Sequence, residues 1–154
     1  MGLEPFGSIW PARVVKHPRL RFLHFRSLNK LHEIERELEA EVRTVRKELE
    51  QKENERNKFE KVIEQKQKSL AGKKSPLKDA YGKADPDYLI DAYENWIVEA
   101  ENDYSTSGNT NHPYIKFELL RIEIEGLQDT LILHEQELQK IRKKIRKSVK
   151  FSKK

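Results

Sequence analysis

The fold is decided by residues 113–147, which read PYIKFELLRIEIEGLQDTLILHEQELQKIRKKIRK. Apolar residues recur three and four positions apart through this stretch for about four heptads, which is the a/d pattern of a coiled coil. Pro113 suits the first position of a helix, because its missing N–H would have no partner there. The repeating positions are Phe117, Leu120, Ile124, Leu127, Leu131, His134, Leu138, Ile141 and Ile145. Further apolar residues widen this face and predict contact with two neighbours: Leu119, Ile122, Ile132 and Leu133.

A second long helix is predicted from about residue 25 to residue 71. Its apolar positions alternate four and three apart from Leu38 to Leu49, which again indicates a coiled coil. Ser27 is the predicted N-cap, and Gly72 is the predicted residue after the last turn. Four charged residues fall on the same seam: Glu35, Lys52, Arg56 and Lys66. The cluster at 52–56 predicts that the middle of this helix packs weakly or on one side only.

The connection between the two long helices is predicted to hold a shorter amphipathic helix at about residues 86–101. Asp85-Pro86-Asp87 offers an N-cap candidate, a proline at the first helical position and an acid in the first turn. Ser75-Pro76 predicts a short helical turn that ends near Gly82. Residues 102–112 are polar and predict a loop.

These patterns predict an all-α protein, built as a long antiparallel coiled-coil helical hairpin with a shorter amphipathic helix in the connection. A proline-containing N-terminal arm (1–23) precedes the helical hairpin domain (24–148). That domain holds long helices at about 25–71 and 113–148 and the short helix at about 86–101, and a basic tail (149–154) follows it. Heptads alone leave an extended parallel oligomer open as the alternative.

Positive charge is concentrated at the two ends of the chain. The net charge is +5, yet residues 1–30 carry six basic groups and one acid, and residues 140–154 carry nine basic groups and no acid. An antiparallel hairpin would bring these ends together into one basic pole that can hold an anionic partner. The candidate residues for binding an anionic surface are Arg19, Arg21, Arg26, Lys143, Lys144, Arg146, Lys147 and Lys150.

The C-terminal run also has the pattern of a basic amphipathic helix, with Ile141, Ile145 and Val149 four residues apart among the bases. Such a helix can lie on an anionic membrane or dock in a partner's groove. It can also follow nucleic-acid phosphates, a less favoured partner because a stacking platform for single strands has no support in the sequence. The alternative is the last turns of a coiled coil, whose bases complement the helix dipole.

Catalytic and cofactor chemistry finds no support in the sequence. His32 and Glu35 lie three apart, but Arg36 would repel a cation and no second ligand pair joins them. His134 lies on the apolar stripe and is predicted to pack or to set the register. Residues 72–75 lack the upstream glycine of a phosphate loop. We therefore predict no enzyme activity, no cofactor, no metal and no small-molecule substrate.

Composition predicts a location inside the cell. The chain has no cysteine, so neither disulfides nor thiolate chemistry are available. No uncharged stretch approaches the roughly 20 residues that a membrane span needs. The first eleven residues lack the basic start and apolar run of a signal peptide. A cytoplasmic or otherwise intracellular protein is expected, with attachment to a membrane surface left open.

The predicted function is a non-enzymatic coiled-coil interaction or scaffold module that associates with itself. The alternative is an anionic-surface binder, for a membrane or nucleic acid, that acts through the basic pole. The partner is accordingly expected to be a protein, with a homo-oligomer leading. The residues predicted to form the protein interface are Trp10, Trp96, Ile97, Ile124, Leu127, Leu131, Leu133 and Leu138.

Two stretches resemble an uncharacterised group of fungal helical-hairpin proteins, over about half of the chain. The first is His17-Pro18-Arg19-Leu20 with Phe25-Arg26-Ser27-Leu28-Asn29, followed by Leu31, Glu35, Leu38 and Glu39. The second is the returning helix, from Leu119-Leu120-Arg121 through Ile124 and Leu127 to Leu131. The resemblance implies a coiled-coil hairpin that precedes apolar membrane helices in that family, whereas this sequence continues into a basic segment. The family has no assigned activity, so the resemblance implies no site residues.

Overall fold

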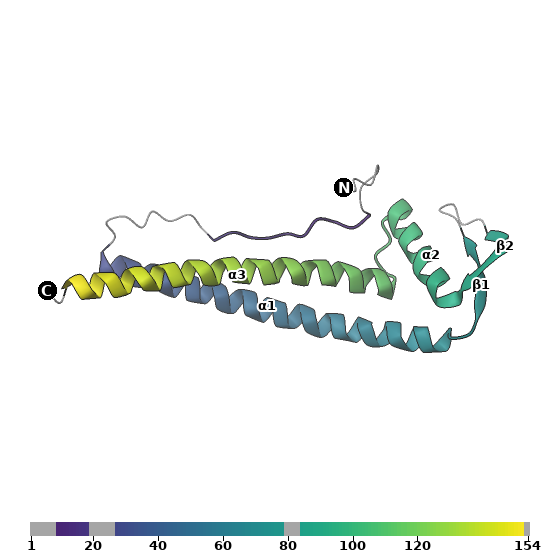
Figure 1. The fold of residues 1–154 in the computed structure, drawn as a ribbon, viewed down its shortest axis with the longest axis horizontal. Helices are drawn as coiled ribbons and strands as arrows, with labels where there is room; N and C mark the ends of the chain where they lie inside the picture. Colours follow the sequence, from purple (N-terminus) through teal and green to yellow (C-terminus); the bar gives the residue numbers. More distant parts are fainter. Residues whose placement is uncertain (1–8, 19–26, 79–83, 153–154) are drawn as a thin grey trace. The chain divides into compact units, whose positions relative to one another are not determined.

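The computed structural model describes residues 9–18, 27–78 and 84–152. In these residues the chain forms α1 (Leu28–Ser69), β1 (Lys74–Lys78), β2 (Ala84–Asp91), α2 (Ala92–Ser107) and α3 (Pro113–Ser152), in that order (Figure 1). The chain divides into two compact units. The first unit comprises Met1–Ala12 and Glu53–Ile122, and the second unit comprises Arg13–Lys52 and Glu123–Lys154.

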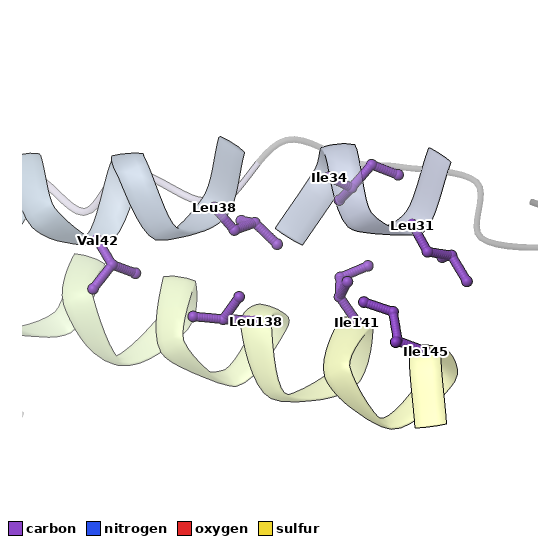
Figure 2. Packing of buried hydrophobic residues seen from close by; sticks show 7 residues of the cluster. All are labelled: Leu31, Ile34, Leu38, Val42, Leu138, Ile141 and Ile145. Atoms are coloured by element: carbon purple, nitrogen blue, oxygen red, sulfur yellow. The ribbon is translucent and has the colours of Figure 1, made fainter. Parts of the chain in front are cut away.

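The second unit is an antiparallel pair of helical segments, one from α1 and one from α3. Ion pairs join the two helices in reverse order of sequence: Lys52 pairs with Glu123 at 2.9 Å, Arg46 with Glu135 at 3.4 Å and Arg142 with Glu35 at 3.2 Å. Its core is made of Leu31, Ile34, Leu38, Val42, Leu138, Ile141 and Ile145 (Figure 2). The predicted all-α antiparallel hairpin is therefore confirmed.

One predicted seam position of α1 is wrong. Ile34 is buried in the core at 4% exposure, while its neighbour Glu35 turns to the ion pair with Arg142. A carboxylate at the edge of a helix pair keeps part of its hydration and gains a partner, whereas in the core it would lose both. The seam of α1 therefore runs through Leu31, Ile34 and Leu38.

The ends of the long helices follow local signals. The side chain of Ser27 accepts the backbone N–H of Lys30 at 3.2 Å, so Ser27 caps α1 as predicted. After α1 ends at Ser69, Gly72 adopts a positive φ of 76°, a conformation that residues with a Cβ rarely adopt. Pro113 begins α3, as expected from its missing N–H.

The predicted helix at residues 86–101 begins too early. Residues 84–91 form β2, which pairs antiparallel with β1 in the register Ser75↔Ile90 and Pro76↔Leu89. The short helical turn predicted from Ser75 is accordingly wrong for residues 75–78, and residues 79–83 lie outside the described ones. Prolines are compatible with these strands because a two-stranded sheet consists of edge strands alone.

The start of α2 is set by a different cap from the predicted one. The carboxylate of Asp91 accepts the backbone N–H of Tyr93 at 2.9 Å and caps a helix that begins at Ala92. This helix runs on to Ser107 and ends where Gly108 adopts a left-handed φ of 74°. The predicted polar loop at 102–112 is therefore wrong up to residue 107, and only 108–112 connect α2 to α3.

Candidate functional site

The most distinctive surface of the second unit is a row of four cations near the C-terminal end of α3. Lys143, Arg146, Lys147 and Lys150 are three, four and seven positions apart, so they lie on one side of the helix. All four side chains are exposed. We call these four residues the basic face. The opposite side of the same helix turns carries Ile141 and Ile145, which are buried against α1.

The acids near the basic face pair with other bases, so they do not offset its positive charge. Arg142 turns toward α1 and pairs with Glu35 at 3.2 Å and with Glu39 at 3.5 Å. Lys140 lies 3.9 Å from Glu137, which is the last acid of the chain. Every charged residue after Glu137 in the sequence is a base, so positive charge accumulates along the last turns of α3.

The other predicted anion-binding residues lie elsewhere. Lys144 is half-buried on the flank of the helix, away from the basic face. Arg19, Arg21 and Arg26 lie outside the described residues. The predicted basic pole is therefore represented in the described structure by the end of α3.

The predicted protein-interface residues on α3 contribute to packing within the chain. Ile124 and Leu138 are buried at 1% and 5% exposure, and Leu131 packs against the core of the second unit. Leu127 and Leu133 are half-buried. Among the side chains of this helix that the structure describes, the large apolar one that is exposed is instead Ile132, at 52% exposure.

The predicted interface aromatics lie in stacked clusters of the first unit. Trp10 stacks on Tyr104 with a centroid distance of 5.4 Å and meets the edge of Tyr114 at 6.4 Å. Trp96 lies 4.4 Å from the ring of His112 and 5.9 Å from that of Tyr93. Both tryptophans are therefore partly covered by their own chain, as is the half-buried Ile97.

Burial shifts the ionisation of several groups around these clusters. Burial, with a contribution from Glu118, raises the pKa of Tyr114 to about 12. Burial also raises the pKa of Glu101 and lowers that of His112, which Lys66 lowers further. Each shift favours the neutral form of its group: the phenol of Tyr114, the protonated carboxyl of Glu101 and the unprotonated imidazole of His112.

The first unit has a shallow hollow of about 440 Å³ beside Trp96 and His112. Its other lining residues are Val62, Gln65, Lys66, Ser69 and Pro113. The ammonium group of Lys66 lies 5.9 Å from the centre of the Trp96 ring, within the range of a cation–π contact. The lining therefore mixes one cation with aromatic and amide groups, and it has no pair of groups suited to acid–base catalysis.

Sequence reasoning missed a contact between the N-terminal segment and α3 in the second unit. A Cβ at Gly126 would collide with the carbonyl oxygen of Val14, so only glycine permits this approach. Next to it the backbone N–H of Lys16 donates to the Thr130 hydroxyl at 2.9 Å, and Arg13 pairs with Asp129 at 2.6 Å. The available signal was a glycine inside an otherwise regular helix.

This contact gives α3 a second neighbour within the second unit. In the second unit α3 packs on α1 along one side and receives residues 13–16 of the N-terminal segment along another. Gly126 and Thr130 are both buried. The expectation that this helix contacts two neighbours is confirmed.

His134 is buried within the second unit at 6% exposure, which agrees with its prediction as a packed residue. Its Nδ1 lies 2.8 Å from the carbonyl oxygen of Thr130, so Nδ1 carries the hydrogen. Its Nε2 lies 3.3 Å from Glu41 on α1. The side chain therefore links the two helices at one fixed point of their register.

The described residues also bear on metal binding and on crossing a membrane. No group of three or more His, Asp and Glu side chains there is arranged to hold a metal ion. His32 and Glu35 approach to 3.4 Å, and the same carboxylate also pairs with Arg142. None of the helices in the described part of the chain is both long and apolar enough to cross a bilayer.

No family model, curated protein or solved structure matches this chain. The resemblance to fungal helical-hairpin proteins therefore stays a prediction.

Proposed function

We propose that this protein is a non-enzymatic interaction module that docks on a polyanionic surface through the basic face, Lys143, Arg146, Lys147 and Lys150. The observation that carries the proposal is the exposure of all four cations on one side of α3. A regular helix holds them within about 10 Å of one another along its axis. A row of like charges costs repulsion in the free protein, and an anionic surface relieves that cost.

The packing of α3 supports this proposal over self-association through the coiled-coil seam. Ile124 and Leu138, which were predicted to meet a partner, are already buried within the chain. A second chain would have to displace α1 to reach them and would lose the packing that they now make. The basic face can be reached without disturbing the helix pair.

The test is retention on immobilised heparin, a generic polyanion, as a function of salt. We expect the variant Lys143→Glu/Arg146→Glu/Lys147→Glu/Lys150→Glu to elute at much lower salt than the unaltered protein. The matched control reverses four exposed lysines of α1 (Lys47, Lys58, Lys61 and Lys68) and changes the net charge by the same amount.

The control distinguishes the effect of the basic face on retention from the effect of the overall net charge. If the basic face binds, the α1 control stays on the column to higher salt than the α3 variant. Equal loss in the two variants would mean that net charge alone governs retention, and the proposal would be wrong. Circular dichroism of both variants checks that the helices are intact.

A further inference from the structure

We infer that the polyanionic surface is the headgroup layer of a bilayer containing negatively charged lipids, and that α3 lies on it without entering the hydrocarbon. This inference rests on the proposed function and names its partner. Three observations support it. The apolar side of α3 is packed against α1, and three of the four cations of the basic face are lysines. The described tryptophans are engaged with other rings.

Insertion is opposed by the packing of the second unit. A basic amphipathic helix enters a bilayer by burying its apolar side among acyl chains. Here that side carries Leu138, Ile141 and Ile145, which are at most 9% exposed and pack on α1 (Figure 2). The apolar side is therefore already occupied, and charge is the part of α3 left to make contact.

The composition of the basic face suits mobile lipid headgroups. Three of the four cations are lysines, whose ammonium is a compact and strongly hydrated point charge on a flexible stem. Planar, paired hydrogen bonds to fixed phosphates or base edges favour arginine instead, and Arg146 is the one arginine of the row. Lipids diffuse laterally and can gather under a short row of charges without any matched geometry.

Single-stranded nucleic acid is disfavoured by the location of the aromatic residues. Binding of single strands relies on aromatic rings that stack on successive bases beside a basic groove. In the described residues Trp10 stacks on Tyr104 and Trp96 on Tyr93, so both tryptophans are already engaged with other rings of the first unit. A flat anionic layer requires no such rings.

The experiment measures cosedimentation of the full chain with vesicles at about 50 mM and about 200 mM salt. The vesicles contain phosphatidylcholine alone or phosphatidylcholine mixed with phosphatidylserine. A parallel arm measures binding to a duplex DNA under the same conditions. The variants replace the basic face, or Lys47, Lys58, Lys61 and Lys68 as the control, with glutamine.

We expect binding to the phosphatidylserine vesicles that exceeds binding to the DNA and weakens steeply with salt. Each cation near such a surface is worth about fivefold in affinity, so removal of all four should weaken binding on the order of a hundredfold or more. The glutamine control on α1 should bind like the unaltered protein.

Other outcomes overturn the inference in distinguishable ways. Face-dependent binding to DNA that equals or exceeds binding to the vesicles would make the bilayer the wrong partner and leave the proposed function standing. Binding to neither, together with no retention on heparin, would overturn both. Binding to pure phosphatidylcholine, or binding that salt does not weaken, would mean insertion and contradict a helix that stays on the surface.

Discussion

At the scale of single residues, Gly126 is a position where a single added atom, a Cβ, would collide with another part of the backbone. The space that a side chain at residue 126 would need is filled by the backbone of Val14, which cannot move aside as a flexible side chain would. The neighbouring contacts, Lys16 to Thr130 and Arg13 to Asp129, depend on the same close approach. A glycine inside a helix costs about 0.5–1 kcal/mol relative to alanine, and this contact accounts for it.

We predict that Gly126→Ala releases the N-terminal segment while leaving the helix pair intact. The backbone amide of Lys16 should exchange its hydrogen faster, because its bond to Thr130 is lost. The melting temperature should change little or fall slightly, because the helix preference of alanine, about 0.5–1 kcal/mol, offsets the contacts that are lost. Hydrogen exchange read by mass spectrometry checks this.

Gln128→Ala is the matched control, since Gln128 is exposed on the same helix two residues further on. It should leave exchange at Lys16 unchanged. If Gly126→Ala also leaves that exchange unchanged, the segment does not depend on this contact.

His112 gives the first unit a predictable response to acid. Its Nδ1 accepts the backbone N–H of Tyr114 at 3.1 Å, and it can do so only while that nitrogen is unprotonated. Burial and Lys66 lower the pKa of this imidazole below its ordinary value of 6.5. The unfolded chain therefore binds more protons than the folded chain as the pH falls through 6.5.

We predict that this residue's contribution to the free energy of unfolding is complete above pH 6.5. It should decrease as the pH falls from there toward the lowered pKa of the folded state. The raised pKa of Glu101 acts in the opposite direction, in a window that begins near 4.5, so the measurement belongs between pH 5.5 and 7.5.

His112→Asn isolates the effect, because asparagine can still accept the Tyr114 N–H but does not titrate. Urea unfolding at several pH values should show the unaltered protein losing stability relative to this variant on acidification. Parallel curves for the two proteins would show that His112 contributes no pH dependence.

At the scale of the elements, the clearest contrast is between α3 and the connection. The start of α3 at Pro113 follows from one proline, and heptad spacing accounts for its buried residues Leu120, Ile124, His134, Leu138, Ile141 and Ile145. In the connection, Asp85-Pro86-Asp87 predicts a helix start, but the helix is capped instead by Asp91. The pairing of β2 with β1 excludes the predicted helix start, because residues 84–91 cannot pair in a sheet and also begin a helix.

The basic face is also a property of one element together with its neighbour. Helical spacing predicts that Lys143, Arg146, Lys147 and Lys150 share a side of α3. Its exposure depends on α1, which packs on the opposite side and draws Arg142 away to Glu35. The same run of bases placed Lys144 among the anion-binding candidates, and packing leaves it half-buried on the flank.

At the scale of the whole molecule, self-association stays a prediction, and the structure narrows where it can arise. The seam residues Ile124 and Leu138 are occupied within the chain, so association would have to use apolar side chains that remain exposed. Among the described side chains of α3, the exposed large apolar one is Ile132, at 52% exposure. Burial of the half of this isoleucine that is still exposed would be worth about 1–1.5 kcal/mol.

We predict that light scattering behind a sizing column, at two protein concentrations and moderate salt, gives a mass above 18.3 kDa that rises with concentration. Ile132→Lys should return it to 18.3 kDa, because a charge at the contact would be buried without a partner.

Gln136→Lys is the matched control, because it adds the same charge at an exposed position one turn further along α3. It should leave the mass as high as that of the unaltered protein. A mass of 18.3 kDa for the unaltered protein at both concentrations would contradict self-association.

The sequence by itself determined the two long helices and the gathering of cations near the end of α3, and it favoured an antiparallel hairpin while leaving a parallel oligomer open. These depend on spacing along one helix and on charge composition, which are local properties of the chain. Only the tertiary structure decided that β2 replaces the expected helix start and that Ile34 rather than Glu35 enters the core. It also decided that Val14 lies against Gly126. Each of these depends on a contact between residues distant in sequence, where packing and pairing outweigh the local preference.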